Sequence, residues 1–111
     1  MTENFLNYLW KHKLIGPNLR LSSGETLIVA DPGQRNQDSG PDFFNARIRI
    51  ANTLWAGNVE VHVRSSDWWR HGHHSDKAYA SIILHVVYEN DRQVYDARGR
   101  ALPTLVLAGS I

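Results

Sequence analysis

Apolar side chains recur along one helical face near the N-terminus. They fall at the spacing of an α-helix, and they are Phe5, Leu6, Leu9 and Trp10. Thr2 precedes them and is a residue type that caps helix N-termini, while Gly16-Pro17 follows and does not continue a helix. The pattern therefore predicts an amphipathic helix that ends near Lys13.

Alternation of apolar and polar residues predicts strands over the next part of the chain. Residues 19–21 and 26–30 are strand-like and flank a short polar turn, whereas residues 31–41 are rich in Gly, Pro, Asn and Asp and predict a loop. In residues 44–50, Phe, Ala and Ile alternate with Asn and Arg, and in residues 59–64 Val alternates with Glu, His and Arg. We expect these last two segments to pair as antiparallel, half-buried strands.

The C-terminal half combines an irregular connection with a buried strand. Residues 65–80 lack a strand pattern and predict an irregular or helical connection, with Ser66 or Ser75 as caps. Residues 81–88 are almost continuously apolar, which indicates a central strand covered on both faces. A short strand at residues 93–96 and an edge strand at residues 103–108 complete the pattern.

This order of elements predicts an α/β (α+β) domain. The N-terminal helix is expected to pack against one face of a mixed, mostly antiparallel sheet, with Glu60 on the other face. The density of strands leaves an alternative open, an all-β cupin-like sandwich of two packed sheets without that helix in the core.

Composition narrows the classes of function. A chain of 111 residues fits one domain, residues 1–111, and 42% hydrophobic with 21% charged residues is typical of a folded protein. The lack of cysteine excludes a disulfide scaffold, a thiolate zinc site and a cysteine nucleophile, and it agrees with a cytoplasmic location. No apolar run is long enough to predict a membrane span. With a net charge of +1, binding of nucleic acid would need a local basic surface.

Two carboxylates and a histidine form the first candidate site. Asp42 opens one predicted strand, and Glu60 and His62 share a face of the neighbouring strand. Converging carboxylates are ligands that suit Mg²⁺ or Mn²⁺, and a nearby base could orient water for attack on a phosphodiester. Arg47 and Arg64 come from the same strands and could hold phosphate. The alternative is that all these side chains form the solvated face of a hairpin.

A histidine-rich connection forms the second candidate site. Its metal-capable side chains fall within six residues, and they are His71, His73, His74 and Asp76. Zn²⁺, Fe²⁺ or Ni²⁺ would accept such ligands, although an exposed loop remains the alternative. Trp68 and Trp69 should anchor the segment to the body of the domain. His85, inside the apolar strand, is either a buried neutral imidazole or a partner or ligand in a metal site.

Several motifs, in order along the chain, resemble one protein family. They are Asn36-x-x-Ser39-Gly40-Pro41-Asp42-Phe43, Gly57-Asn58-Val59-Glu60-Val61-His62, Ser66-Asp67-Trp68, His71-x-His73 and Leu84-His85-Val86-Val87. Together they resemble a family of bacterial proteins, common in Bacteroidetes, described as a domain of unknown function (DUF2851). Members of that family are longer, so the resemblance implies that this chain is an N-terminal piece on which the remainder packs. It names no reaction.

A more distant similarity is to the PD-(D/E)xK nuclease superfamily. There a helix precedes a three-strand meander, an aspartate opens the second strand, and an acid-x-lysine motif lies on the third. A helix and a buried strand follow. Pro41-Asp42 and Glu60-x-His62 stand where that pattern places its site. His62 replaces the lysine, and Glu3 is the only acidic residue of the leading helix.

The expected function is a metal-dependent phosphodiesterase of nuclease type. Asp42 and Glu60 would bind the metal, and His62, with an ordinary pKa of about 6.5, would activate water. His71 and His73 would contact substrate or metal. Two alternatives remain. One is a cupin-like metal-binding protein that uses His62, His71, His73 and His85, and the other is a non-catalytic module that binds nucleic acid or a protein.

Overall fold

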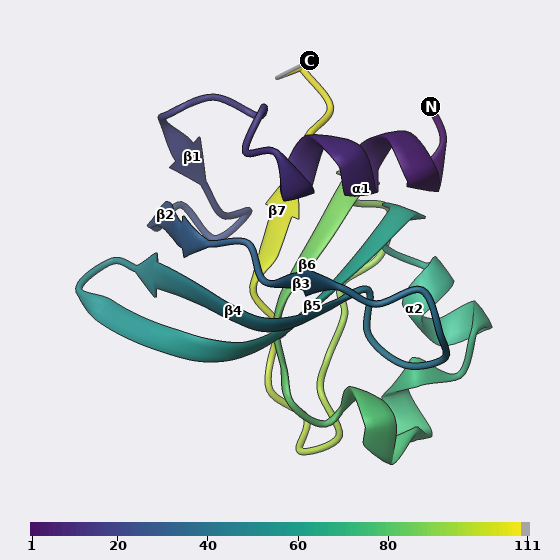
Figure 1. Cartoon of the computed structure of the whole chain (residues 1–111). Helices are drawn as coiled ribbons and strands as arrows, with labels where there is room; N and C mark the ends of the chain where they lie inside the picture. The colour runs from purple at the N-terminus through teal and green to yellow at the C-terminus, as the bar shows by residue number, and fades with distance from the viewer. Residues whose placement is uncertain (110–111) are drawn as a thin grey trace.

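A computed structural model describes residues 1–109 and contains more strand than helix. Its elements, in chain order, are α1 (Glu3–Lys11), β1 (Leu19–Arg20), β2 (Thr26–Asp31), β3 (Gln34–Arg35), β4 (Phe43–Ile50), β5 (Thr53–Arg64), α2 (Asp67–Arg70), the 3₁₀ turns η1 (His73–Ser75) and η2 (Lys77–Tyr79), β6 (Ile82–Glu89) and β7 (Thr104–Val106) (Figure 1). Among the described residues, no helix is long and apolar enough to cross a membrane.

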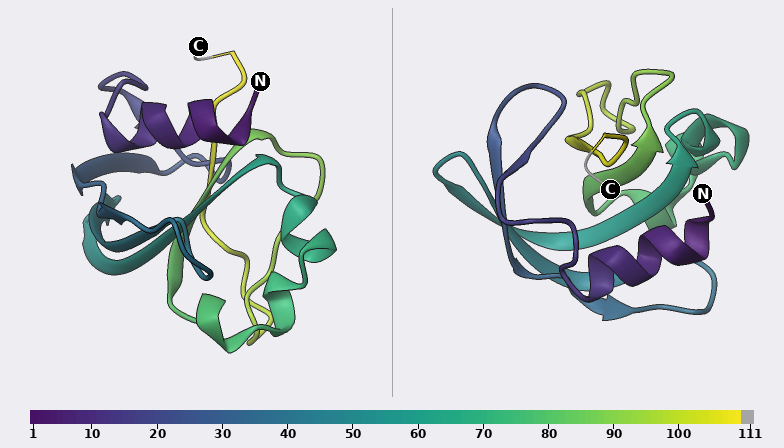
Figure 2. Two further views of the ribbon diagram at one scale, coloured as in Figure 1. Left: turned by 45° about the vertical axis from the view of Figure 1, so that its right-hand side comes forward. Right: turned by 90° about the horizontal axis from the view of Figure 1, so that it is seen from above.

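The strands form one strongly curved sheet in the order β1-β2-β4-β5-β6-β7, with β3 paired to β4. Strand β6 runs parallel to both β5 and β7, and the other pairs are antiparallel. The two ends of the sheet approach each other, and the Ser22 N–H donates to the Thr104 carbonyl at 2.8 Å. The result is a nearly closed, barrel-like sheet (Figure 2).

Helix α1 packs on the inner face of this sheet. Thr2 caps it, its hydroxyl accepting from the Phe5 N–H at 3.2 Å. Leu6 and Trp10 are fully buried in one core with Val59 of β5 and other inward-facing strand residues. The predicted helix and its packing against the sheet are confirmed.

The opposite, outer face of β5 and β6 is also covered. Glu60 and His62 alternate with the inward-facing valines of β5, yet both are buried, because the segment containing α2, η1 and η2 lies over them. A second apolar cluster forms there around Trp68 and Ile82. Strand β6 therefore has cover on both faces, as its apolar sequence predicted.

Several details correct the sequence-based picture. The domain combines helix and sheet but is mostly β, so an α/β fold is not confirmed, and its described strands form one sheet, not the two of a cupin-like sandwich. Phe43 faces the core and Phe44 is exposed, because the β4–β5 register shifts near Asn45, which has a φ of 60°. The predicted loop contains β3, and the predicted strand at residues 93–96 is reduced to a bridge between Tyr95 and Ala101.

Candidate functional site

Glu60 lies at the centre of the buried polar cluster on the outer face of β5. Its two carboxylate oxygens contact different groups. Oε1 accepts from the backbone N–H of Asp42 at 3.1 Å. Oε2 lies 2.7 Å from Nε2 of His73 and 3.5 Å from Nε2 of His62. Only 4% of Glu60 is exposed, so one buried carboxyl group joins an acidic side and an imidazole side.

Asp42 is held beside Glu60 by the loop that leads into β4. Its Oδ2 accepts from the Val61 N–H at 2.8 Å, and its Oδ1 lies 3.5 Å from an Arg35 guanidinium nitrogen. The Asn36 side chain fixes the loop by donating to the Pro41 carbonyl at 2.9 Å. Sequence analysis placed Asp42 here but missed Arg35, because the two-residue strand that carries it has no detectable alternation.

Three carboxyl groups influence one another at this position. Burial, and then the neighbouring Asp42, raise the pKa of Glu60 to about 10. Burial, and then the charge of Asp42, also raise the pKa of Glu3 at the start of α1. A buried carboxyl with a raised pKa favours its neutral form until a cation compensates the charge. The acidic side of the cluster is therefore electrostatically suited to a cation.

The imidazole side begins with a buried histidine pair. His62 Nδ1 lies 2.8 Å from His85 Nε2, and both rings are almost completely buried. Burial is the largest cause that lowers the pKa of His62 to about 2 and of His85 to about 3. The expected pKa near 6.5 for His62 is therefore wrong, because that expectation assumed a solvated ring. His85 is the hydrogen-bonded, neutral imidazole that sequence analysis offered as one alternative.

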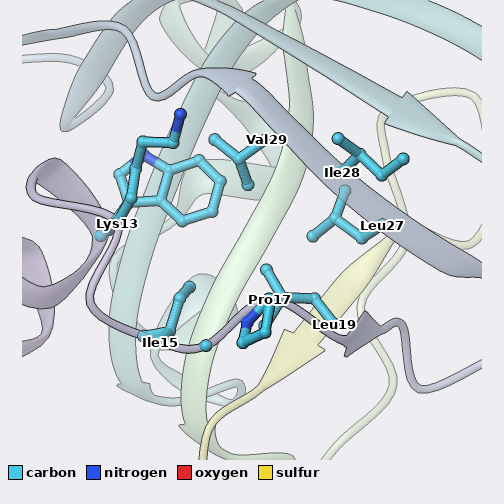
Figure 3. A pocket seen from close by; sticks show the side chains of 9 residues that line it. Lys13, Ile15, Pro17, Leu19, Leu27, Ile28 and Val29 are labelled. Carbon is cyan, nitrogen blue, oxygen red and sulfur yellow. The ribbon is translucent and has the colours of Figure 1, made fainter.

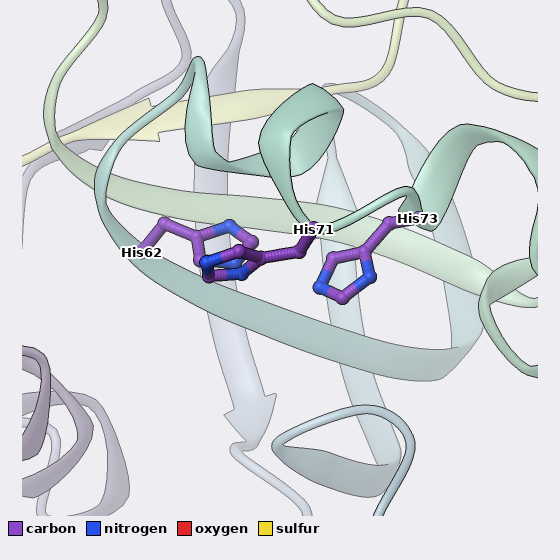
Figure 4. A group of neighbouring side chains, drawn as sticks. All are labelled: His62, His71 and His73. Atoms are coloured by element: carbon purple, nitrogen blue, oxygen red, sulfur yellow. The ribbon is translucent and has the colours of Figure 1, made fainter.

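Three histidines converge beside Glu60. One ring nitrogen from each of His62, His71 and His73 lies within 4.8 Å of the others, and this group could hold a metal ion. In Figure 4 the rings of His62 and His71 overlap in the view, and the ring of His73 lies next to them. The centroid of the His62 ring lies 5.1 Å from that of the His71 ring and 5.2 Å from that of the His73 ring.

The connection between β5 and β6 brings two of these histidines back to the strand. His71 ends α2, and Gly72 then adopts a φ of 72°, a left-handed conformation that glycine takes without strain. This reverses the chain, so His73 returns to the cluster. The start of α2 is tied to the body by Asp91, which accepts from the N–H and the hydroxyl of Ser66. The Ser66 side chain therefore makes no capping bond of its own.

Aromatic rings pack the connection onto the sheet. Trp68 is 2% exposed, and its ring centroid lies 5.4 Å from those of both His73 and His85. Tyr79 stacks on His73 with centroids 3.7 Å apart, a contact that sequence analysis missed. Trp69 is half-buried, and its ring contacts that of His74 at a tilt, with centroids 4.8 Å apart, so His74 lies outside the cluster. The expected anchoring role of the tryptophan pair is confirmed.

The two predicted phosphate-binding arginines do not converge. Arg47 pairs in register with Ala56, four residues before Glu60 on β5, or about 13 Å along a strand. Arg64 lies four residues after Glu60 and pairs with Glu89 at 3.8 Å. Both are exposed. Arg35 is the arginine that reaches the carboxylates.

One pocket lies beside the Glu60 cluster, and a larger one lies away from it. A pocket of about 110 Å³ borders His73, Trp68 and Tyr79. A larger one of about 380 Å³ lies between the end of α1 and strands β1 and β2 (Figure 3). Its lining is mostly apolar, with Lys13 as its charged side chain, so it offers none of the groups of the Glu60 cluster.

Comparison with known proteins adds a family. The model of the family described as "Protein of unknown function (DUF2851)" matches residues 3–111. The chain belongs to this family. Neither a curated protein nor a solved structure matches it. For this DUF2851 domain, function therefore has to be argued from the side chains around Glu60.

Proposed function

We propose that this DUF2851 domain is a metal-dependent hydrolase that cleaves phosphodiesters, as nucleases do. The observation that supports it most is the contact between Asp42 and Glu60. They are 18 residues apart in sequence, yet Glu60 Oε1 accepts from the backbone N–H of Asp42 at 3.1 Å, and a hydrogen bond with the Asp42 side chain helps to raise the pKa of Glu60. Burying carboxyl groups together is unfavourable without a compensating cation.

The donor set fits a divalent ion. Carboxylate oxygens are the ligands that Mg²⁺ and Mn²⁺ prefer, and Mn²⁺ is also bound by groups of intermediate softness. Asp42 and Glu60 would hold the ion, and Glu3 adds a third carboxyl whose pKa responds to Asp42. A bound divalent ion polarises a phosphoryl oxygen and lowers the pKa of water.

The surrounding residues would position the substrate. Arg35, 3.5 Å from Asp42, presents a guanidinium suited to a phosphate oxygen. His62 is too buried to exchange protons readily with solvent and serves better as a neutral ligand or orienting group. His71 is exposed and lies beside His62, so it is the imidazole better placed to contact a substrate or a metal.

The order of elements agrees with the distant nuclease similarity. Helix α1 precedes the antiparallel strands β2, β4 and β5; Asp42 immediately precedes the second of these strands, and Glu60 lies on the third. A helical connection and β6, parallel to β5, follow. This supports the nuclease type of chemistry over that of a cupin-like protein.

The proposal is tested by incubating the chain with single- and double-stranded DNA and RNA in the presence of Mg²⁺ or Mn²⁺. We expect metal-dependent cleavage that Glu60→Gln abolishes, because the amide cannot neutralise a cation but keeps the size and hydrogen bonding of the protonated acid. Asp38→Asn is the matched control, since Asp38 is an exposed carboxylate of the same loop as Asp42. It should cleave like the wild type.

Failure to cleave any substrate would contradict the proposal. Tight binding of intact nucleic acid under the same conditions would instead support the non-catalytic alternative. Cleavage unchanged in Glu60→Gln would show that the reaction occurs elsewhere.

A further inference from the structure

We infer that the imidazole side of Glu60 is a second metal site, formed by His62, His71, His73 and the Glu60 Oε2 oxygen, for an ion of the Zn²⁺, Co²⁺ and Fe²⁺ class. It is separate from the carboxylate position between Glu60 and Asp42. The inference rests on the proposed function in one respect, which is that Glu60 serves both positions.

The two carboxylate oxygens of Glu60 face different groups. Oε1 is turned toward Asp42, and Oε2 lies 2.7 Å from His73 Nε2 and 3.5 Å from His62 Nε2. A carboxylate whose oxygens face different ligand sets can bridge two metal ions, which in two-metal hydrolases lie about 3.5–4 Å apart. Imidazole favours Zn²⁺ and its neighbours, whereas carboxylates favour Mg²⁺ and Mn²⁺.

The spacing of the three histidines fits a metal after a small contraction. Their nitrogens lie within 4.8 Å of one another. Nitrogens bound to one tetrahedral Zn²⁺ at about 2.0–2.1 Å lie roughly 3.4 Å apart. The widest separation therefore has to close by roughly 1.4 Å. His71 is exposed and follows a four-residue helix, so its ring can move that far.

His85 supplies the orienting partner that a metal-binding histidine needs. A ligand histidine usually donates its other N–H to a neighbouring acceptor, which fixes its tautomer. His62 Nδ1 lies 2.8 Å from His85 Nε2, so His62 can donate there and leave its Nε2, the nitrogen nearest Glu60, free for a metal.

Unpartnered buried nitrogens provide independent support. Nδ1 of His73 and Nδ1 of His85 are both buried without a hydrogen-bond partner, and such groups are uncommon in folded proteins. Burying the imidazoles of His62, His73 and His85 beside one acid is costly for stability alone. A functional ligand set accounts for the cost.

The test uses Co²⁺, because its visible absorption reports tetrahedral, nitrogen-rich ligation in the absence of any substrate. Wild-type chain titrated with Co²⁺ should develop the intense tetrahedral bands with one ion bound at this site. His71→Ala should weaken this binding at least about 10-fold, since even loss of an outer partner of a ligand has an effect of that size. His71 is exposed, so the variant should fold.

Two further variants separate this site from its surroundings. His74→Ala, a change in the same connection outside the cluster, should bind Co²⁺ like the wild type. Asp38→Asn should also keep the tetrahedral bands, because Asp38 is an exposed carboxylate of the loop before β4 and lies outside the cluster. Absence of the bands in the wild type, wild-type affinity in His71→Ala, or loss of the bands in Asp38→Asn would each overturn the inference.

The readout distinguishes the two proposals. Tetrahedral Co²⁺ bands lost in His71→Ala, together with no cleavage of any nucleic acid, would support this site and contradict the hydrolase. Mg²⁺-dependent cleavage without those bands would support the hydrolase and contradict this second metal site.

Discussion

At the scale of single residues, Glu60 is the centre of the candidate site. Its oxygens contact Asp42 on one side and His73 on the other, and burial keeps both contacts out of bulk water. Burial and the hydrogen bond with the Asp42 side chain raise the pKa of Glu60 to about 10, so the metal-free carboxyl favours its neutral form at pH 7. Metal binding would displace the proton of that neutral carboxyl, which couples affinity to pH.

The identities of the site residues followed from the sequence more readily than their environments did. Strand alternation placed Glu60 and His62 on one face, and the Pro41-Asp42 step placed the second carboxyl. The burial of that face did not follow, because it depends on a connection that packs against it from residues 65–80. For the same reason the lowered pKa of His62 and the role of Tyr79 had no signal in the local sequence.

The buried histidines predict a loss of stability in acid. Folding lowers the pKa values of His62, His73 and His85 to about 2, about 4 and about 3, from 6.5. The unfolded chain therefore binds more protons as the pH falls below 6.5, and the free energy of unfolding decreases toward pH 4. Glu60, whose pKa is raised, acts in the opposite direction above about 4.5. Between about pH 4.5 and 6.5, the unfolded chain therefore binds about two more protons than the folded chain.

Urea unfolding of metal-free protein in EDTA, measured between pH 7 and pH 5, checks this prediction. Stability should fall steeply over that interval. In the Glu60→Gln variant, which lacks the opposing group, the fall should be steeper still. A free energy of unfolding that is constant or rises toward pH 5 would show that the imidazoles are accessible to protons in the folded state.

At the scale of elements, the connection between β5 and β6 covers the outer face of β5 and brings His73 to Glu60. It contains only short helical segments, α2, η1 and η2, and side chains anchor it to the rest of the domain. Asp91 holds its beginning through Ser66, and Trp68 packs its centre against His85. Its irregular character was predictable, but its path was not, because the glycine reversal at Gly72 is a tertiary feature.

Trp68 should therefore contribute strongly to stability. Trp68→Ala is expected to lower the free energy of unfolding by about 3–5 kcal/mol, because a fully buried indole is replaced by a cavity. Trp55 is the matched control, since it is 48% exposed near the β4–β5 turn. Trp55→Ala should cost much less. Chemical denaturation monitored by circular dichroism makes the comparison, and equal effects in the two variants would mean that the connection is not anchored.

At the scale of the whole molecule, the curvature of the sheet separates two environments. The inner face holds the apolar core and α1, and the outer face of β5 and β6 holds the polar cluster. The sequence predicted the helix, most strands and the buried central strand. It did not predict near closure, because that depends on a contact between Ser22 and Thr104, which are 82 residues apart and have no pattern in common. The domain is mostly β, whereas the sequence predicted an α/β (α+β) domain.

The central claim is that a metal ion binds at Glu60. It is tested most directly by an anomalous difference map from crystals of the wild-type chain grown with Mn²⁺. The account predicts a peak at about 2.0–2.6 Å from a carboxylate oxygen of Glu60, with Asp42 or the histidines as further ligands. Ordered Glu60, Asp42 and His73 side chains without any such peak, in crystals grown with Mn²⁺ in large excess over the protein, would contradict it.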